Sequence, residues 1–210
     1  MTFLALLDYC GVAVFAATGA LAASRKQLDI IGFLFLAGLT GVGGGTLRDL
    51  VLGLAPVFWV REGAYIAVCA ATAVAVYFAA PYVEYRYRLL LWLDAIGLSA
   101  YCVMGAAVGL AAGASAPVAV LTGMMTATFG GVLRDVVSGE PSVLLRREIY
   151  VTAALAGAAL FVLLERVGVD PALSAGAAAL AALAVRGGAL AFGWTLPGYR
   201  HRPGRPAGEF

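Results

Sequence analysis

The chain contains the same segment twice, 86 positions apart. Residues 44–62 and 130–148 match at ten of nineteen positions. The matching residues of the first copy are Gly44, Gly45, Leu47, Arg48, Asp49, Val51, Gly53, Val57, Arg61 and Glu62. The same shift pairs Asp8 with Asp94 and Thr40 with Thr126. The chain is therefore two copies of one unit, and each copy carries a glycine-rich apolar segment that ends in Arg-Asp.

Composition identifies the repeated unit as a membrane unit. Apolar residues make up 62% of the chain and charged residues 12%, with a mean hydropathy of +0.94, whereas soluble domains have ~45–50% and ~25%. A hydrocarbon core of ~30 Å needs ~20 apolar residues per helix. The sequence therefore predicts an all-α integral membrane protein, a single domain over residues 1–210, with seven transmembrane helices. The predicted spans are residues 2–22, 30–53, 63–81, 89–111, 117–138, 149–165 and 171–194.

The basic residues are distributed unevenly between the connections. If the N-terminus is outside, the inside loops and tail hold Arg25, Lys26, Arg86, Arg88, Arg146, Arg147, Arg200, Arg202 and Arg205. The outside loops then hold only Arg61 and Arg166. The positive-inside rule predicts this orientation, with a cytoplasmic C-terminus.

Three spans per copy reverse the direction of the chain. Repeat A, about residues 1–84, and repeat B, about residues 87–170, therefore enter the membrane from opposite sides. This predicts a 3+3 inverted repeat, followed by a seventh helix at about 171–194 and a basic tail at 197–210.

Glycines precede each Arg-Asp pair inside a span. Glycine lowers helix propensity by ~1 kcal/mol relative to alanine, so Gly43, Gly44 and Gly45 predict a kinked second span, and Gly130 and Gly131 a kinked fifth span. Close packing between helices is the other interpretation of these glycines. The Arg-Asp pair favours a polar site, because charged groups at depth cost ~2.5–3.5 kcal/mol each and persist mainly when paired or hydrated.

The partners of these charges are expected on other spans, across the interface between the repeats. Arg48 and Asp49 are adjacent and lie ~100° apart around a helix, so they are not expected to face one partner. We hypothesise that Arg48 and Arg134 meet carboxylates in a partly hydrated cavity near a pseudo-two-fold axis. The candidate carboxylates are Asp49 and Asp135, with Asp8 and Asp94 as secondary candidates near the ends of their spans. A sealed ion-pair lock that only holds the repeats together is the alternative.

No catalytic or cofactor motif accompanies these charges. The sequence has no H-E-x-x-H, no G-x-S-x-G and no phosphate-binding loop, so we expect neither an enzyme nor a nucleotide-driven pump. Cys10, Cys69 and Cys102 are isolated within apolar segments, which argues against a metal site or a disulfide frame. The net charge of +2 argues against a nucleic-acid partner. Arg186 in the last span is expected to reach the interface or a lipid head group.

The two glycine-rich segments resemble a known family. GVGGGTLRDLVLG at residues 41–53, TFGGVLRDVVSGEP at residues 128–141 and the seven-span layout are similar to the prokaryotic branch of the trimeric intracellular cation (TRIC) channels. The resemblance covers nearly the whole chain. It implies a homotrimer in which each protomer holds its own pore between the repeats. The implied partners are potassium or sodium ions and membrane lipids, and the implied location is the inner membrane of a bacterium.

The resemblance also implies which residues lie at or beside the pathway. These are Gly43, Gly44, Gly45, Arg48, Asp49, Phe129, Gly130, Gly131, Arg134 and Asp135. The second copy departs from the first at Phe129, which stands where Gly43 stands, so its bend is expected to be shallower or gated by the ring. No T-V-G-Y-G filter is present, which favours modest selectivity.

Two other functions are compatible with the same residues. Related sequences carry the label of a glycine transporter domain, and a secondary transporter of a small solute such as glycine would use Arg48 or Arg134 to bind a carboxylate. A membrane scaffold that acts through trimerisation is the third interpretation.

Overall fold

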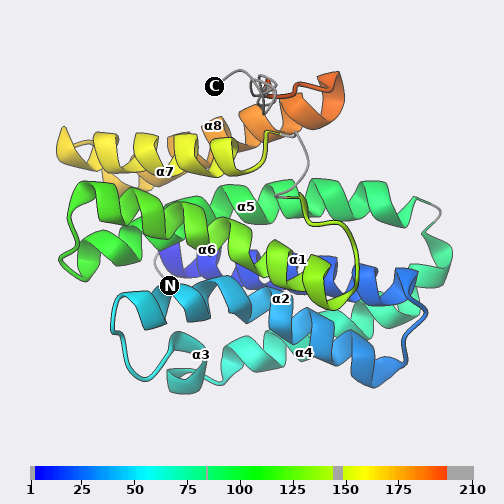
Figure 1. Cartoon of the computed structure of the whole chain (residues 1–210). Coiled ribbons are helices and arrows are strands. Elements are labelled where there is room, and N and C mark those ends of the chain that lie inside the picture. The colour runs from blue at the N-terminus through cyan, green and yellow to red at the C-terminus, as the bar shows by residue number, and fades with distance from the viewer. Residues whose placement is uncertain (1–2, 84, 144–148, 198–210) are drawn as a thin grey trace, which may run out of the picture.

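The computed structural model describes residues 3–83, 85–143 and 149–197, with side chains in the first helix from Asp8 onwards. Every regular element in this part of the chain is helical, as the sequence predicted (Figure 1). The elements are α1 (Phe3–Arg25), α2 (Ile30–Val51), α3 (Phe58–Arg61), α4 (Ala64–Ala79), the 3-10 turn η1 (Ala80–Tyr82), α5 (Arg86–Ala111), α6 (Ala116–Val137), α7 (Val151–Arg166) and α8 (Pro171–Phe192). Outside the described residues lie the predicted tail beyond residue 197 and five of the basic residues used for the orientation: Arg146, Arg147, Arg200, Arg202 and Arg205.

The seven longer helices coincide with the seven predicted apolar runs. Their boundaries agree to within three residues, and the short helix α3 is the element that hydropathy did not predict. Among the described residues, α2, α4 with η1, α5, α6 and α8 are long and apolar enough to cross a membrane. Helix α7 has 16 residues, and only two residues separate it from the undescribed segment 144–148. The count of seven spans therefore stays a prediction.

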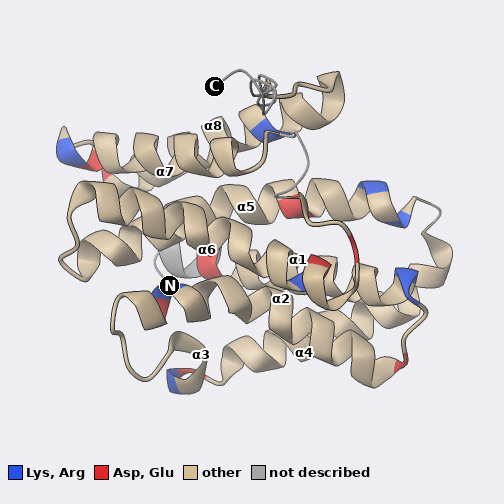
Figure 2. Cartoon of the chain, viewed as in Figure 1, with Lys and Arg blue, Asp and Glu red and all other residues tan. Residues whose placement is uncertain are grey.

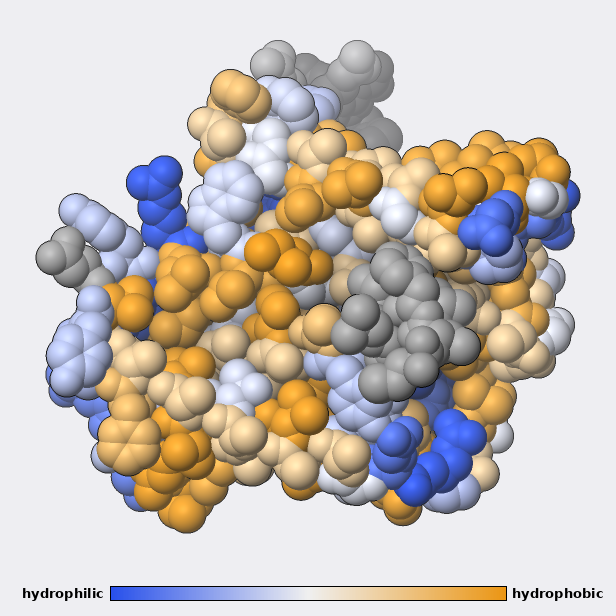
Figure 3. All heavy atoms as spheres, turned by 180° about the vertical axis from the view of Figure 1, so that it is seen from behind, coloured by the Kyte–Doolittle hydropathy of each residue, from blue (hydrophilic) through white to orange (hydrophobic). Residues whose placement is uncertain are grey.

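The surface of the bundle is that of a protein surrounded by lipid. At 1.5 Å per residue a 22-residue helix such as α2 is roughly 33 Å long, which matches a hydrocarbon core of ~30 Å. Large apolar side chains such as Ile31, Leu50 and Phe78 are 65%, 67% and 68% exposed. Apolar residues cover most of the face in Figure 3, whereas charged residues gather towards the ends of the helices (Figure 2). Exposed apolar surface of this extent is typical of a membrane contact.

The duplication of the sequence is also a duplication of helices. Helix α6 begins and ends 86 residues after α2, and α5 and α7 follow α1 and α4 at nearly the same spacing. Figure 1 shows α2 and α6 running in opposite directions. The end of the bundle that carries Arg25, Lys26, Arg86 and Arg88 is called the basic end below.

The glycines do not interrupt their helices. Helix α2 is continuous through Gly43, Gly44 and Gly45, and α6 is continuous through Gly130 and Gly131. Glycine therefore breaks neither helix, because helical hydrogen bonds continue and tertiary packing outweighs the propensity cost of glycine. A bend of an intact helix stays a prediction.

Candidate functional site

Each Arg-Asp motif lies in the last turn of its helix, where the chain turns back. After α2, Gly53 adopts a φ of +68°, which glycine reaches without steric cost. The Leu54 N–H then donates to the carbonyl oxygen of Asp49 at 2.8 Å, a Schellman-type closure. After α6, Gly139 at φ +64° and the Asp135 carbonyl repeat this turn.

The two aspartate carboxylates join the helix end to the following loop. Asp49 Oδ2 accepts from the Phe58 N–H at 2.7 Å, and Asp135 Oδ2 accepts from the Val143 N–H at 3.0 Å. The other oxygen of each carboxylate binds the preceding arginine. Each aspartate therefore fixes both a guanidinium group and a loop.

We call Asp8, Arg48, Asp49, Phe58 and Tyr65 the first cluster. Arg48 donates from Nε at 2.8 Å and from Nη2 at 2.7 Å to Asp49 Oδ1. Arg48 is 4% exposed and Asp49 is fully buried. The Phe58 ring centroid lies 5.4 Å from the guanidinium carbon of Arg48, and Asp8 Oδ2 accepts from the Tyr65 hydroxyl at 2.6 Å. The Arg48–Asp49 ion pair is shielded from solvent, whereas Asp8 is half-buried.

Tyrosines connect the first cluster to the surface. The Tyr9 and Tyr65 rings stack with centroids 4.5 Å apart, and the Tyr9 hydroxyl donates to the exposed carboxylate of Glu62. Two hydroxyl–carboxylate pairs therefore lie side by side, one towards solvent and one towards the cluster.

We call Asp94, Arg134, Asp135, Val143 and Tyr150 the second cluster. Arg134 donates from Nη1 to Asp94 Oδ1 at 2.8 Å, and from Nε at 3.0 Å and Nη2 at 2.9 Å to Asp135 Oδ1. Arg134 and Asp94 are each 1% exposed. One guanidinium group thus holds two carboxylates from two helices.

Gly131 makes room for the second cluster. A Cβ atom at this position would lie 2.7 Å from the Tyr150 hydroxyl oxygen and 3.2 Å from Asp94 Oδ1. Arg186 lies with its guanidinium carbon 5.1 Å from the Tyr150 ring centroid, and its Nη1 donates to the Ile149 carbonyl oxygen at 3.3 Å. Arg186 is fully buried, so the expectation that it reaches the interface is wrong.

The two clusters lie at opposite ends of the bundle, because α2 and α6 are antiparallel (Figure 1). Arg134 and Asp135 line a small hollow at the basic end together with Arg25 and Glu140. Glu140 Oε1 lies 3.5 Å from Arg25 Nη2 and 3.2 Å from Lys26 Nζ. The second cluster is therefore covered on the basic side by a second layer of ion pairs.

Between the clusters, α2 and α6 cross at glycines through reciprocal contacts. A Cβ at Gly44 would overlap the carbonyl oxygen of Thr126, and a Cβ at Gly130 would overlap that of Thr40. Gly44 and Gly130 are equivalent in the two repeats, as are Thr40 and Thr126. Such exchange of partners is what an approximate two-fold axis between the repeats produces.

A second reciprocal contact lies between α1 and α5. Gly11 contacts the Tyr101 ring, and Gly97 contacts the Phe15 ring. These two rings, again equivalent in the repeats, stack with centroids 5.3 Å apart. The contact extends the approximate symmetry from α2 and α6 to the whole core.

The structure corrects three expectations about the charged residues. Arg48 binds its own neighbour Asp49, because a long arginine side chain can fold back along the helix surface. The charges form two separate clusters, each within one repeat, and not one cavity at the axis. Asp94 lies eight residues after the start of α5 and is buried, so its description as a span-end carboxylate is wrong. Arg134 does meet a carboxylate of another span, Asp94. Both residues belong to repeat B, so the expected contact across the repeat interface is wrong.

Other predicted residues are placed as follows. Gly43 faces α6, where a Cβ would lie 2.8 Å from Leu133 Cδ1. Gly45 packs against the Phe58 ring. Phe129 is half-buried on α6, and its predicted gating role stays a prediction.

Sequence reasoning did not identify the tyrosines of the clusters. Tyr65 and Tyr150 occupy similar places, but the 86-residue shift takes Tyr65 to Val151. The one-residue offset hides them from a repeat alignment. The sequence signal that could have identified them is a tyrosine that follows each Arg-Asp motif by about 16 residues.

The described residues contain no group of three or more His, Cys, Asp or Glu side chains that could hold a metal ion. Cys69 and Cys102 are buried free thiols, and Cys10 is an exposed one. The chemistry available at the two clusters is therefore that of ion pairs, phenols and backbone groups.

Comparison with known proteins agrees with the repeat. A family model described as Glycine transporter matches residues 5–81 and again residues 91–166, so one model fits each half of the chain. The two matches begin 86 residues apart, at the shift found within the sequence.

The chain is similar to bacterial membrane proteins and to solved channels. It is 34% identical over 204 residues to a UPF0126 membrane protein of Vibrio cholerae, covering 93% of this chain and 82% of that protein. It is 39% identical over 155 residues to the UPF0126 inner membrane protein YadS of Escherichia coli, covering 72% and 73% of the two chains. The structure of the TRIC trimeric intracellular cation channel orthologue from Rhodobacter sphaeroides matches with a TM-score of 0.90 and 52% identity, over 92% of this chain and 100% of that chain.

Proposed function

Because the chain belongs to the trimeric intracellular cation (TRIC) channel family, we propose that it conducts monovalent cations passively, with potassium as the main permeant ion. In this proposal the chain crosses the membrane seven times, as a 3+3 inverted repeat plus α8. Three copies assemble, and each holds its own pore between its repeats.

The proposed orientation has the N-terminus outside and the C-terminus in the cytoplasm, in the inner membrane of a bacterium. Arg25, Lys26, Arg86 and Arg88 all lie at the basic end, which supports placing that end inside. The opposite end carries Arg61 and Arg166.

The pair of clusters at opposite ends of α2 and α6 carries the proposal. Each cluster as defined holds one arginine and two aspartates. The first cluster therefore has a formal charge of −1, and a charge of this sign favours cations over anions. At the second cluster the buried Arg186 lies against Tyr150 and offsets that charge. The proposed path leads from one cluster, past the crossing at Gly44 and Gly130, to the other.

The geometry corresponds to a closed state of such a path. Arg48 and Arg134 are both buried and bound to carboxylates. Conduction therefore requires the ion pairs of the clusters to separate or to become hydrated. In this proposal, the ion-pair lock considered in the sequence analysis is the closed form of the gate.

A secondary transporter of a small solute such as glycine is the second candidate, because the matching family model carries that description. Its substrate carboxylate would bind Arg48 or Arg134. Both guanidinium groups are already occupied by aspartates, so the substrate would have to displace a bound carboxylate.

Planar-bilayer recording of the purified protein tests the proposal. We expect unitary currents in symmetric KCl. Their amplitude should rise with the KCl concentration, and the ion flux should exceed the rates at which transporters saturate. Proteoliposomes supplied with external labelled glycine provide the opposing measurement. Saturable glycine uptake without unitary currents, over a range of voltages and in both KCl and NaCl, would replace the channel by the transporter.

A further inference from the structure

Two adjoining hollows at the basic end are distinct from the two clusters. The first, of about 420 Å³, is lined by aromatic side chains of α2, α4 and η1, and by Arg86. The second, of about 740 Å³, lies around the start of α5 and is lined by Arg25, Arg86 and Arg88 with tyrosines. Both are lined by Pro81 and Arg86, so we treat them as one site, the α4–α5 hollow.

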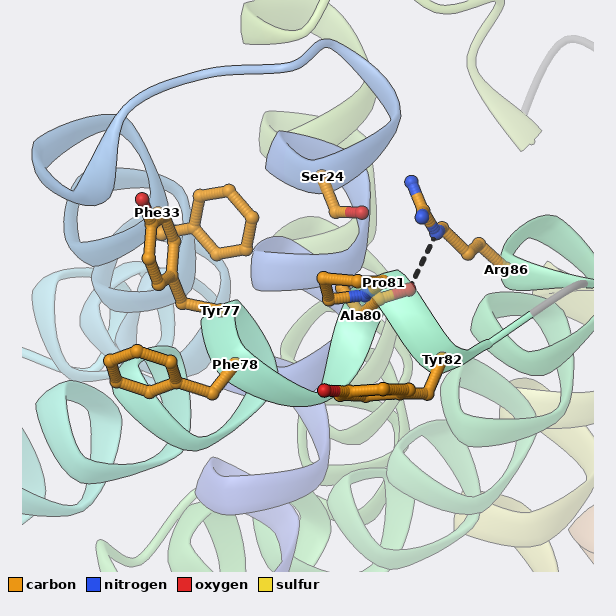
Figure 4. A pocket seen from close by; sticks show the side chains of 8 residues that line it. All are labelled: Ser24, Phe33, Tyr77, Phe78, Ala80, Pro81, Tyr82 and Arg86. Atoms are coloured by element: carbon orange, nitrogen blue, oxygen red, sulfur yellow. Dashed lines mark hydrogen bonds between the residues drawn. The ribbon is translucent and has the colours of Figure 1, made fainter.

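Arg86 joins the two parts of the α4–α5 hollow. Figure 4 shows its side chain reaching from the start of α5 to the carbonyl oxygen of Ala80, to which Nε donates at 2.9 Å. This bond fixes the guanidinium group, and its two terminal nitrogens make no further hydrogen bond to the described residues. Among the described residues, no carboxylate lies within 4 Å of Arg86 or Arg88.

The third arginine is only partly neutralised. The guanidinium carbon of Arg25 lies 4.5 Å from the Tyr87 ring centroid. Its Nη2 lies 3.5 Å from Glu140 Oε1. The described lining of the hollow thus contains three arginines and no acidic side chain. Glu84, which stands between the lining residues Val83 and Tyr85 in the sequence, lies outside the described residues. Three arginines gathered at one hollow favour an anion.

The aromatic part of the hollow determines what kind of anion fits. Phe78, Tyr82 and Tyr85 are 68%, 89% and 73% exposed, and exposed rings at the end of a span are typical of the membrane interface. Phe33 and Tyr77 form an edge-on pair with centroids 5.0 Å apart beside them (Figure 4). A soluble anion gains nothing by contacting these apolar side chains, whereas an acyl chain packs against them.

We propose that the α4–α5 hollow binds an anionic phospholipid of the leaflet at the basic end. Its phosphate lies against Arg86 and Arg88, and an acyl chain lies against Phe33, Tyr77 and Phe78. A zwitterionic lipid offers the same phosphate, but its ammonium group opposes the arginines. Each basic residue near such a surface contributes about fivefold in affinity, the equivalent of ~1 kcal/mol.

The test is lipid binding to the purified, detergent-solubilised full chain, followed by native mass spectrometry. Phosphatidylglycerol and phosphatidylethanolamine with identical acyl chains are titrated separately. We expect tighter binding of phosphatidylglycerol, weakened about fivefold by Arg88→Ala and further by Arg86→Ala with Arg88→Ala. Arg86→Lys with Arg88→Ala keeps the charge at position 86. If this variant remains folded, its affinity should return close to that of Arg88→Ala alone.

Arg166→Ala is the matched control, because Arg166 is exposed at the opposite end and does not line the hollow. Equal binding of the two lipids, or equal affinities of Arg88→Ala and Arg166→Ala, would overturn the proposal. Inorganic phosphate that competes fully with phosphatidylglycerol would show a simple phosphate site and overturn the lipid assignment. Because the readout is binding and not current, these outcomes are independent of the channel proposal.

Discussion

Equivalent aspartates of the two repeats have different partners. Asp94 is bound by Arg134 and buried, whereas Asp8 accepts a hydrogen bond from Tyr65 and is half-buried. Among the described residues, Asp8 has no arginine within 4 Å. The repeats thus share residue types at these positions but differ in how tightly each cluster is closed.

The replacements Asp94→Asn and Asp8→Asn should therefore differ in stability. Removing one member of a buried ion pair costs about 3–5 kcal/mol, because the other charge stays buried. Asp94→Asn should approach that range, softened by the remaining bond of Arg134 to Asp135. Asp8→Asn keeps an oxygen that accepts from the Tyr65 hydroxyl and loses only the negative charge, so its cost should stay below the ~1.5–3 kcal/mol of a charge-assisted hydrogen bond. Thermal unfolding in detergent measures both, and equal losses would contradict the difference between the clusters.

The same two variants separate a lock from a gate. If the second cluster only locks the repeats, Asp94→Asn lowers the unfolding temperature without changing unitary currents. If it is the gate, the folded fraction of Asp94→Asn should show a raised open probability, because Arg134 is then held by one carboxylate. Recordings of Asp8→Asn provide the reference, and unchanged gating in Asp94→Asn would remove the gating role.

At the scale of helices, the crossing of α2 and α6 depends on the absence of side chains at Gly44 and Gly130. Both positions face a backbone carbonyl of the other helix, and backbone cannot move aside as a flexible side chain does. Gly44→Ala and Gly130→Ala should each cost about 1–3 kcal/mol of overpacking. The two losses should be similar, because the contacts are reciprocal.

Gly38→Ala is the control in the same helix. No atom lies within 4 Å of a Cβ placed at Gly38, so this variant should be neutral or gain up to ~1 kcal/mol of helix propensity. Thermal unfolding of the three variants in one detergent gives the comparison. A Gly44→Ala variant as stable as Gly38→Ala would show that the helices separate at no cost.

Helices were predictable from the sequence and side-chain partners were not. Apolar runs about as long as the bilayer is thick, bounded by polar residues, placed all seven longer helices. The 86-residue repeat predicted that Arg48 and Arg134 play equivalent parts. It could not show that each arginine folds back onto its neighbour, because that depends on the rotamer and on the loop amide that fixes the aspartate. Tyr65 and Tyr150 were missed for a related reason, since their hydroxyl groups converge from positions one residue out of register.

At the scale of the whole molecule, inverted insertion can be tested at equivalent positions of the two repeats. Leu28, before α2, corresponds to Ala114, before α6. In a background without Cys10, Cys69 and Cys102, Ala114→Cys should react with an impermeant maleimide in intact cells. Leu28→Cys should react only after permeabilisation. Labelling of both from the same side would exclude opposite insertion, whatever the channel activity.

The exchange of partners at Gly44 and Gly130 makes the contact surface of each half its own complement. A fragment that ends after α4 carries Gly44, which leaves room for a carbonyl of the other helix. It also carries the Thr40 carbonyl, which occupies the equivalent space at Gly130. Two identical fragments, one upside down relative to the other, could therefore meet through the surface that now joins the halves. The linker between α4 and α5 only keeps the two halves close to each other. The contacts by which the halves recognise each other lie in the helices, and each half carries both partners of the contact.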